Sequence, residues 1–309
     1  MLENFLMAGE QTLIVFLLIA LGFFTGKKGI IDNHMADKIA GIVINIAMPA
    51  VIILAFQREF EKGLVKEFML SMVMDVLGTV LAILVAVLTI RGKDSKRISV
   101  LRNAAIFPNI AMMAMPMQGA MFGADGVFCG AAHIAVFNLV FWPYCEIVLG
   151  NGDKKSLLKK IFLNPCVIST GIALLLFFCG ITIPEIPAKA LGHLSDLVLP
   201  LSMIILGQKL TRKPFATLFG DWGNLLAAAE KLVIVPLLLL FIMKGLHIGG
   251  VVGVSTVISV ASPAAANVGM VAVTYGQDSE LAASAVSMST VLSLITMPLI
   301  IALASIMLL

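Results

Sequence analysis

Long apolar runs, separated by short charged or Gly/Asp/Asn-rich breaks, recur along almost the whole chain. A helix needs about 20 apolar residues to cross the hydrocarbon core of a bilayer. The pattern therefore predicts an all-α integral membrane protein with ten transmembrane helices and no soluble domain. The expected spans are Thr12–Gly26, Ile39–Phe56, Phe68–Ile90, Val100–Phe122, Val127–Leu149, Ile161–Gly180, Leu191–Leu210, Leu225–Met243, Val251–Tyr275 and Leu281–Leu308.

The composition supports a membrane protein. Of the 309 residues, 60% are hydrophobic and only 13% are charged, which is too little charge to cover the surface of a soluble protein of this size. The net charge of +3 gives no reason to expect a nucleic-acid partner. We expect membrane lipid to be the main surroundings of the folded chain.

Lysine and arginine concentrate in the odd-numbered loops, and cytoplasmic loops are the ones enriched in these residues. We therefore expect the odd loops in the cytoplasm and both termini outside it. No basic residue precedes Lys27, so the first span lacks the basic start of a signal peptide and is expected to be retained. The basic residues of the odd loops are Lys27, Lys28, Arg91, Lys93, Lys96, Arg97, Arg102, Lys154, Lys155, Lys159, Lys160, Lys209, Arg212 and Lys213.

Two proline-containing stretches recur in the same order in both halves. Met48-Pro49-Ala50-Val51 in the second expected span resembles Leu199-Pro200-Leu201-Ser202 in the seventh, and Phe107-Pro108-Asn109 in the fourth has a counterpart in Ser262–Asn267 of the ninth. Five spans per half make the halves inverted copies, an arrangement typical of transporters. We expect a first repeat over residues 1–150, a cytoplasmic linker over 151–160 and a second repeat over 161–309.

The prolines of the fourth and ninth spans predict broken helices. A proline deletes a helical hydrogen bond, and the freed carbonyl must face protein or a water-filled cavity. Each half-helix after a break starts with unpaired N–H groups and the positive end of a dipole. Asn109 and Asn267 would add amide donors there, with Ser262 nearby, which suits a carboxylate. The alternative is that each asparagine makes only a helix–helix hydrogen bond.

Ionisable residues within the expected spans are a second pointer to function, because they are costly in a membrane. Asp75 and Lys231 lie in the third and eighth spans, which the repeat makes equivalent. They would form a structural ion pair or couple proton movement to transport. Glu230 lies nearer the cytoplasmic end, where it would reach water. For His133 a satisfied buried imidazole is favoured over a titrating one.

Other chemistry has little support in the sequence. Cys129, Cys145, Cys166 and Cys179 lie in apolar segments without Cys-x-x-Cys spacing, as expected of buried apolar side chains. No metal-ligand spacing, Gly-x-Ser-x-Gly or phosphate loop stands out. The closely spaced Gly119, Gly123, Gly126 and Gly130 predict close helix contact. We expect neither an enzyme nor a resident metal or cofactor.

The ordered set of motifs resembles the auxin efflux carrier family, which contains the plant PIN auxin transporters and bacterial organic-acid permeases. The likeness covers essentially the whole chain and is strongest at the two broken spans. The motifs are Pro108-Asn109 with Pro116, Ser262–Asn267, Asn164-Pro165, the stretch from Pro200 to Gly207, and Leu281-Ala282-Ala283-Ser284 with Leu292–Pro298.

The resemblance implies a fold like that of the bile-acid:sodium symporters, with broken helices 4 and 9 crossed. It implies a scaffold of spans 1, 2, 6 and 7, a transport domain of spans 3–5 and 8–10, elevator-type alternating access and a homodimer. Many plant members have a long cytoplasmic loop that this sequence lacks, so the resemblance favours a bacterial permease of the inner membrane. The residues implied to bind substrate are Pro108, Asn109, Ser262, Pro263, Ala264 and Asn267.

The sequence thus favours a secondary transporter of a small organic anion, a mono- or dicarboxylate such as malonate or malate. Asp75 and Lys231 are the expected ion-coupling residues, and coupling to H⁺, to Na⁺ or to no ion stays open. The first alternative is a cation/proton antiporter, which also uses crossed helices but usually places carboxylates at the crossing. The second is a membrane sensor that binds its ligand without transporting it.

Overall fold

The computed structural model describes residue 14 and residues 17–58, 61–149, 163–211 and 220–309. The expected linker over 151–160 lies outside the described residues, as do Arg212, Lys213 and the expected starts of the first and sixth spans at Thr12 and Ile161.

Helices make up nearly all of the described chain, and three of them contain a π-helical segment, labelled η. The first is Leu17–Lys27. The others are α2 (Asn33–Ile42), η1 (Val43–Ala47), α3 (Met48–Ala55), α4 (Lys62–Thr89), α5 (Ser95–Ile106), η2 (Ile110–Ala114), α6 (Met115–Val148), α8 (Pro165–Cys179), α9 (Glu185–Asp196), α10 (Val198–Lys209), α12 (Trp222–Ala229), η3 (Glu230–Ile234), α13 (Val235–Gly245), α14 (Gly250–Ala261), α15 (Asn267–Thr274) and α16 (Ser279–Leu308).

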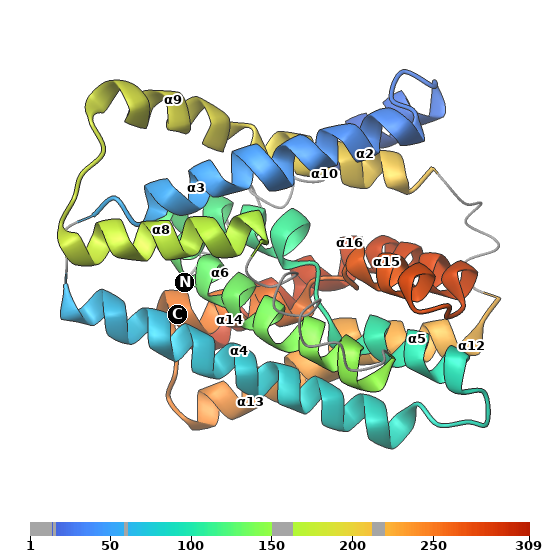
Figure 1. Ribbon diagram of the computed structural model, residues 1–309. Helices are drawn as coiled ribbons and strands as arrows, with labels where there is room; N and C mark the ends of the chain where they lie inside the picture. Colours follow the sequence, from blue (N-terminus) through green and yellow to red (C-terminus); the bar gives the residue numbers. More distant parts are fainter. Residues whose placement is uncertain (1–13, 15–16, 59–60, 150–162, 212–219) are drawn as a thin grey trace.

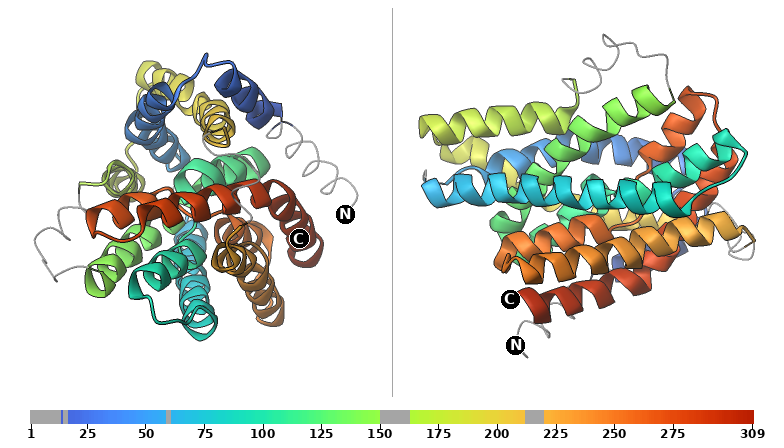
Figure 2. Two further views of the ribbon diagram at one scale, coloured as in Figure 1. Left: turned by 90° about the vertical axis from the view of Figure 1, so that its right-hand side faces the viewer. Right: turned by 90° about the horizontal axis from the view of Figure 1, so that it is seen from below.

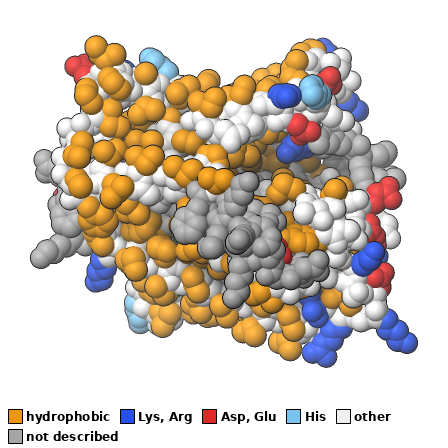
Figure 3. All heavy atoms as spheres, in the orientation of Figure 1, with side chains coloured by type: hydrophobic (Ala, Val, Ile, Leu, Met, Phe, Trp, Pro, Cys, Tyr) orange, Lys and Arg blue, Asp and Glu red, His pale blue; other side chains and the backbone are white. Residues whose placement is uncertain are grey.

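Six helices of the described residues are long and apolar enough to cross a membrane, and three shorter ones are also apolar. In Figure 3 hydrophobic side chains cover most of the visible face, and charged side chains gather toward its ends. The protein is therefore all-helical and suited to crossing a membrane several times. The count of ten spans in two inverted halves stays a prediction. The six long helices are Asn33–Ala55, Gly63–Thr89, Ile110–Val148, Glu185–Lys209, Trp222–Gly245 and Ser279–Leu308.

Each π-helical segment ends just before a helix whose second residue is proline. These prolines are Pro49 after η1, Pro116 after η2 and Pro236 after η3. A proline cannot donate to the carbonyl four residues back, and its ring clashes with that carbonyl. A wider π turn relieves the clash while the helix continues. The bulges therefore accompany three of the helix prolines, whereas Pro143 and Pro298 lie inside the described helices α6 and α16 without one.

Aspartate or asparagine side chains start five of the helices. The capping residues of α2, α5, α8, α12 and α16 each accept hydrogen bonds from backbone N–H groups of the first turn, which have no helical partner. At α12, burial raises the pKa of the cap Asp221, but bonds from Arg97 and the N–H of Asn224 outweigh it, so its pKa lies below the ordinary value. The caps are Asp32, Asp94, Asn164, Asp221 and Asp278.

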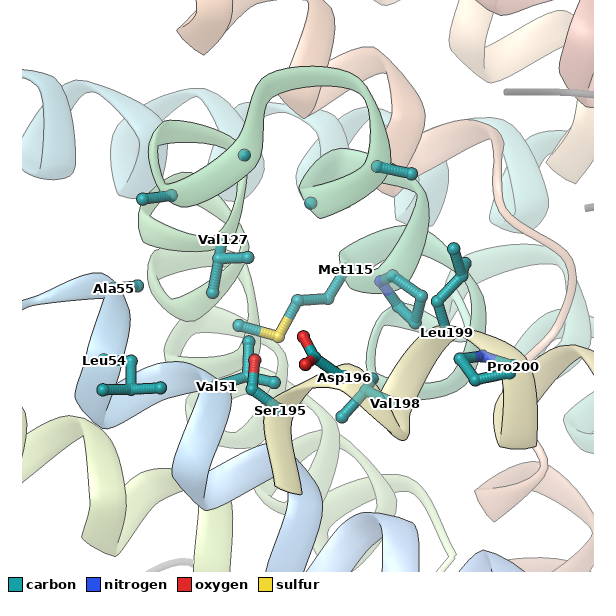
Figure 4. A pocket seen from close by; sticks show the side chains of 15 residues that line it. Val51, Leu54, Ala55, Met115, Val127, Ser195, Asp196, Val198, Leu199 and Pro200 are labelled. Carbon is teal, nitrogen blue, oxygen red and sulfur yellow. The ribbon is translucent and has the colours of Figure 1, made fainter. Parts of the chain in front are cut away.

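Helix α6 doubles back on itself at Gly123, whose φ of 59° and ψ of −135° interrupt the helix. A Cβ at Gly126 would lie 2.0 Å from the carbonyl oxygen of Gln118, and one at Gly130 would lie 2.9 Å from Cγ of Met115. Such contacts require two limbs packed backbone to backbone, as Figure 4 shows. The glycine spacing thus allows close helix contact, as predicted. We call this unit the α6 hairpin.

The helices form two groups (Figure 1). Helices α2, α3, α8, α9 and α10 lie along one side, where α3 packs on α8 and α9 and α10 packs on α2. Helices α4, α13 and α14 lie along the other, with α14 also packed on α6 and α16. The end-on view in Figure 2 shows the same separation. The α6 hairpin lies between the groups.

The helix Leu17–Lys27 joins the first group through a reciprocal pair of glycines. A Cβ at Gly22 would lie 2.0 Å from the carbonyl oxygen of Ile204, and one at Gly207 would lie 1.9 Å from that of Ile19. Only glycine permits two backbones to approach so closely. The first helix and α10 are therefore packed too tightly to slide past one another.

Candidate functional site

Two helices break at the same place and cross there. Helix α5 ends at Ile106, and Phe107 and Asn109 have extended or irregular backbone before η2 begins at Ile110. Helix α14 ends at Ala261, and Ser262 is extended. The two breaks form an antiparallel bridge between Pro108 and Ala264.

The bridge satisfies backbone groups that the breaks leave free. Asn109 N–H donates to the Pro263 carbonyl at 2.8 Å, and Ala265 N–H donates to the Phe107 carbonyl at 2.9 Å. An unpaired backbone group inside a membrane is costly, so each break stabilises the other. The pairing predicted from the two proline motifs is thus a direct contact in the fold.

Side chains from neighbouring helices satisfy two more groups at the crossing. The Ala264 N–H donates to Oγ of Ser289 on α16 at 3.1 Å. The Lys231 ammonium donates to the Ile106 carbonyl, at the end of α5, at 3.2 Å. The first halves of the broken helices are therefore held by protein groups.

The second halves have no such side-chain partners, although backbone carbonyls at the breaks accept from the N–H groups of Ile110, Val268 and Gly269. No side chain caps η2, which begins at Ile110 and runs into α6, and none caps α15, which begins at Asn267. The first N–H groups of a helix have no partner within it, and they carry the positive end of the dipole. Two positive helix ends are therefore left beside the bridge.

Asn109 and Asn267 stand at these two helix starts and are half-buried. Within the part of the chain that the structure describes, neither side-chain amide makes a hydrogen bond, although the backbone of Asn109 does. The alternative in which each asparagine only joins two helices is thus not what the described contacts show. Both amides are free to bind a ligand.

Two cavities meet at Asn109. The first, the Asn109 cavity, measures about 350 Å³ and lies between η2, α10, α15 and α16. The second, the Asn267 cavity, measures about 260 Å³ and is lined by both Asn109 and Asn267. Met112, Lys209 and Ala266 also line both. These volumes suit a small molecule rather than a large one.

The Asn267 cavity has two further asparagines in its wall, Asn138 and Asn164, but both are engaged. Asn138 Oδ1 accepts from Trp142 Nε1 at 3.2 Å and from Asn164 Nδ2 at 3.0 Å. Asn164 also caps α8. These amides therefore shape the wall, and Asn109 and Asn267 carry the unused donors.

The other predicted substrate-binding residues divide into two kinds. Pro108 lines the Asn267 cavity. Ser262, Pro263 and Ala264 are buried and line neither of these two cavities. The Ser262 hydroxyl donates to the Ser259 carbonyl at 2.8 Å. These three residues form the break and its bridge, and their predicted contact with substrate stays a prediction.

Asp75 and Lys231 are both almost fully buried, but no direct ion pair joins these two described side chains. Asp75 instead accepts from the Ser259 hydroxyl of α14 at 3.1 Å, whereas Lys231 binds the end of α5. Each is thus attached to the first half of one broken helix. A cation at a helix C-terminus is favourable and a carboxylate there is not, so Asp75 requires a compensating charge or a proton. Lys231 attracts Asp75 electrostatically without a direct contact and supplies part of that compensation.

Two other sequence expectations are decided by burial. Glu230 is buried, and its carboxylate accepts a hydrogen bond from the Thr89 hydroxyl of α4. The expectation that it reaches water is therefore wrong. His133 is fully buried, with Nδ1 3.1 Å from Gln118 Nε2 and Nε2 3.4 Å from Thr256 Oγ1. A neutral imidazole satisfies both contacts, so His133 is the satisfied buried histidine that the sequence favoured.

A third cavity, of about 430 Å³, lies between α3, the α9–α10 junction and the α6 hairpin. In Figure 4, Val51, Met115, Val127 and Asp196 converge on it from these elements. Asn109 and Asn267 are not among its lining residues. Its wall separates the hairpin from the first group of helices and is mostly apolar, with the Ser195 hydroxyl and the Asp196 carboxylate as polar members.

Two residues of the cavity walls were not identified from the sequence. Lys209 was assigned to a cytoplasmic loop, yet it ends α10 and lines both cavities. Ser202 lines the Asn109 cavity. They lie seven residues apart, so two helical turns bring them to one face of α10. That spacing was the available signal, but a periodicity does not say which face meets a cavity.

The sequence was compared with known proteins. The family described as "Membrane transport protein" matches residues 7–154 and 151–301. An uncharacterized transporter of Methanocaldococcus jannaschii is 28% identical over 301 residues, covering 94% of this chain and 96% of the relative. An uncharacterized transporter of Methanothermobacter thermautotrophicus is 26% identical over 299 residues, covering 96% and 98%. The chain belongs to the membrane transport protein family, that of the auxin efflux carriers.

Proposed function

We propose that this transporter-family protein is a secondary transporter of a small organic anion, a mono- or dicarboxylate such as malonate or malate. The observation that carries the proposal is the pair of unpartnered amides, Asn109 and Asn267, beside two uncapped helix starts at one cavity. The amide N–H groups are donors and the helix starts are positive dipole ends, and both stabilise a negative charge.

The chemistry of the crossing favours an anion over a cation. Each helix start carries about half a positive charge, so two of them balance one carboxylate. A cation at this place would be repelled by the two positive helix ends, and only the amide oxygens of Asn109 and Asn267 could bind it. The nearest predicted carboxylate, Asp75, binds Ser259 on the other half of a broken helix. The cation/proton antiporter is therefore the weaker candidate.

The proposed transport step is elevator-type alternating access. Ten spans in two inverted halves would place spans 1, 2, 6 and 7 in a scaffold and spans 3–5 and 8–10 in a transport domain. The separation of α2, α3, α8, α9 and α10 from α4, α13 and α14 supports this division. The broken helices would move with the second group in the cell membrane, both termini would lie outside the cytoplasm, and the scaffold would form a homodimer.

Asp75 and Lys231 are the proposed coupling residues. Each holds the first half of one broken helix, so a change in the charge of Asp75 would act on the crossing itself. The carboxylate lies at a helix end that disfavours it. Its protonation on one side of the membrane and release on the other would couple proton movement to the anion.

The experiment is counterflow of labelled malonate and malate in proteoliposomes. Asn109→Ala and Asn267→Ala should each lower uptake about 10- to 100-fold, the range of a charge-assisted hydrogen bond to the anion. Asn45→Ala is the matched control, because that amide is exposed on η1 and bonds only to the Gly41 carbonyl. Normal counterflow in both crossing variants would place the site elsewhere.

The two alternatives are separated by the same vesicles. A pH jump with monovalent cations and no organic anion should give no response, whereas an antiporter would respond. A sensor would bind malonate but show no counterflow in the wild-type protein. Either result would contradict the proposal.

A further inference from the structure

Helix α10 forms a wall of the Asn109 cavity that belongs to neither broken helix. It contributes Ser202, Ile205, Leu206 and Lys209 to that wall. Ser202 and Lys209 are its polar members and stand two helical turns apart, which separates them by about 10 Å along the helix axis. The cavity therefore has polar groups on α10 as well as at the crossing.

Three buried serine hydroxyls in the described part of the chain have no hydrogen-bond partner, those of Ser202, Ser255 and Ser305, and of these Ser202 alone lines one of the three cavities. Within the described residues Ser202 is fully buried, and its Oγ has no hydrogen-bond partner. Helical serines and threonines ordinarily donate to a carbonyl of the preceding turn, as Ser71 and Thr170 do here. Buried polar atoms are nearly always paired, so an unpaired one on a cavity wall points to a ligand that pairs with it.

Lys209 brings a full positive charge to the same space. It is the last residue of α10, it is half-buried, and it lines both cavities that meet at Asn109. A lysine at a helix end in a membrane protein usually extends its ammonium to the interface. Lys209 stands on the walls of the cavities that the two asparagine amides also line.

We propose that Lys209 and Ser202 bind the end of the substrate remote from Asn109 and Asn267, and that Lys209 selects anions with a second negative charge. The inference rests on the proposed function and adds a second pole to the same site. The two helix starts balance one carboxylate. The ammonium of Lys209 is an additional charge that a mono-anion does not use and a dianion does, while the Ser202 hydroxyl donates to the same acid group.

Malonate and its monoamide, malonamate, test the proposal because they have nearly the same shape and differ by one charge. In proteoliposomes, unlabelled malonate should inhibit uptake of labelled malonate by the wild-type protein far more strongly than malonamate does. Lys209→Gln should weaken inhibition by malonate about 10- to 100-fold, which is the range of one charge-assisted hydrogen bond. Inhibition by malonamate should stay the same. Lys209→Arg should keep the preference.

Lys244→Gln is the matched control, since Lys244 is exposed in the last turn of α13 and lines none of the three cavities. It should retain the wild-type preference. Ser202→Ala should weaken inhibition by malonate by a smaller factor. It should not lower the melting temperature, because the Ser202 hydroxyl makes no hydrogen bond within the protein that the substitution could remove.

The outcomes separate this inference from the proposed function. If the wild-type protein and Lys209→Gln discriminate malonate from malonamate equally, Lys209 does not select charge and the inference is overturned. Loss of inhibition by both compounds in Asn109→Ala would still support the crossing as the binding site. If Lys209→Gln weakens both ligands alike, the lysine acts on the fold or the crossing and the inference is overturned. If the wild-type protein accepts neither ligand, the proposed function fails and the inference fails with it.

Discussion

Asn109 and Asn267 owe their proposed role to being neutral. An amide can donate to a carboxylate without adding a charge that must be buried when the site is empty. Both side chains are half-buried beside helix starts that already carry positive character. A transported anion must leave as readily as it enters, so donors without full charge suit the crossing better than lysine or arginine would.

At Asp75 the charge and the hydrogen bond can be separated. Asp75→Asn removes the carboxylate but leaves an oxygen to accept from the Ser259 hydroxyl, so the fold should be kept. We expect normal malonate counterflow and loss of accumulation driven by a pH gradient, because only the second process needs a titrating group. Both are measured in the same proteoliposomes.

Asp125→Asn is the control for that experiment. Asp125 is exposed and pairs with Arg58 at 2.7 Å, away from the crossing, and an exposed ion pair contributes little. It should leave both processes intact. Accumulation that persists in Asp75→Asn would show that the coupling group is another residue or that no proton is coupled.

Among the elements, the α6 hairpin is the most sensitive to packing. The limb that leaves the crossing returns past it only because Gly123 turns the chain and Gly126 lets the limbs touch. Gln118 and His133, one from each limb, then meet in the interior. The hairpin therefore determines where η2 and its Asn109 start.

A methyl group at Gly126 should disrupt this contact. In Gly126→Ala the added carbon would lie 2.0 Å from the Gln118 carbonyl oxygen, so backbone must move. Overpacking of this kind costs about 1–3 kcal/mol or more, and we expect a clear fall in the melting temperature of the purified protein.

Gly171→Ala provides the comparison, because Gly171 lies within α8 and a Cβ there has no atom within 4 Å. Alanine is favoured over glycine in helices by about 1 kcal/mol, so this variant should be as stable as the wild type or slightly more stable. Equal melting temperatures for the two variants would contradict the packing of the hairpin.

For the whole molecule, the sequence predicted the features that follow from local chemistry. Pro108 and Pro263 indicated the breaks, and their order in the two halves indicated that they belong together. Gly119, Gly126 and Gly130 indicated close helix contact. Each prediction rests on a rule about a single residue type, and the structure brings the two breaks into one bridge.

What the sequence left open depends on which side of a helix meets which neighbour. The sequence suggested that Lys209 is a loop charge, and only the position of α10 beside η2 and α15 places it on the cavity walls. The repeat paired Asp75 with Lys231, and the two do attract each other electrostatically, but their hydrogen bonds go to the ends of different broken helices. Hydrophobic periodicity is uninformative where a helix is apolar all round.

The whole-molecule consequence is that two sets of helices meet at one small site. Helix α10 of the first group presents Lys209 and Ser202, and the crossing, which we propose moves with the second group, presents Asn109 and Asn267. Relative movement of the two groups would change the distance between these sets. Under the proposed alternating access, movement of the two groups would therefore change the geometry of the site directly.

The most direct test of the central claim is equilibrium binding of labelled malonate and malate to purified protein, compared among wild type, Asn109→Ala, Asn267→Ala and Asn45→Ala. The account predicts saturable binding in wild type and Asn45→Ala. In each crossing variant it predicts binding weakened about 10- to 100-fold, with the fold intact by melting temperature. Undiminished binding in folded Asn109→Ala and Asn267→Ala would show that the crossing does not hold the anion.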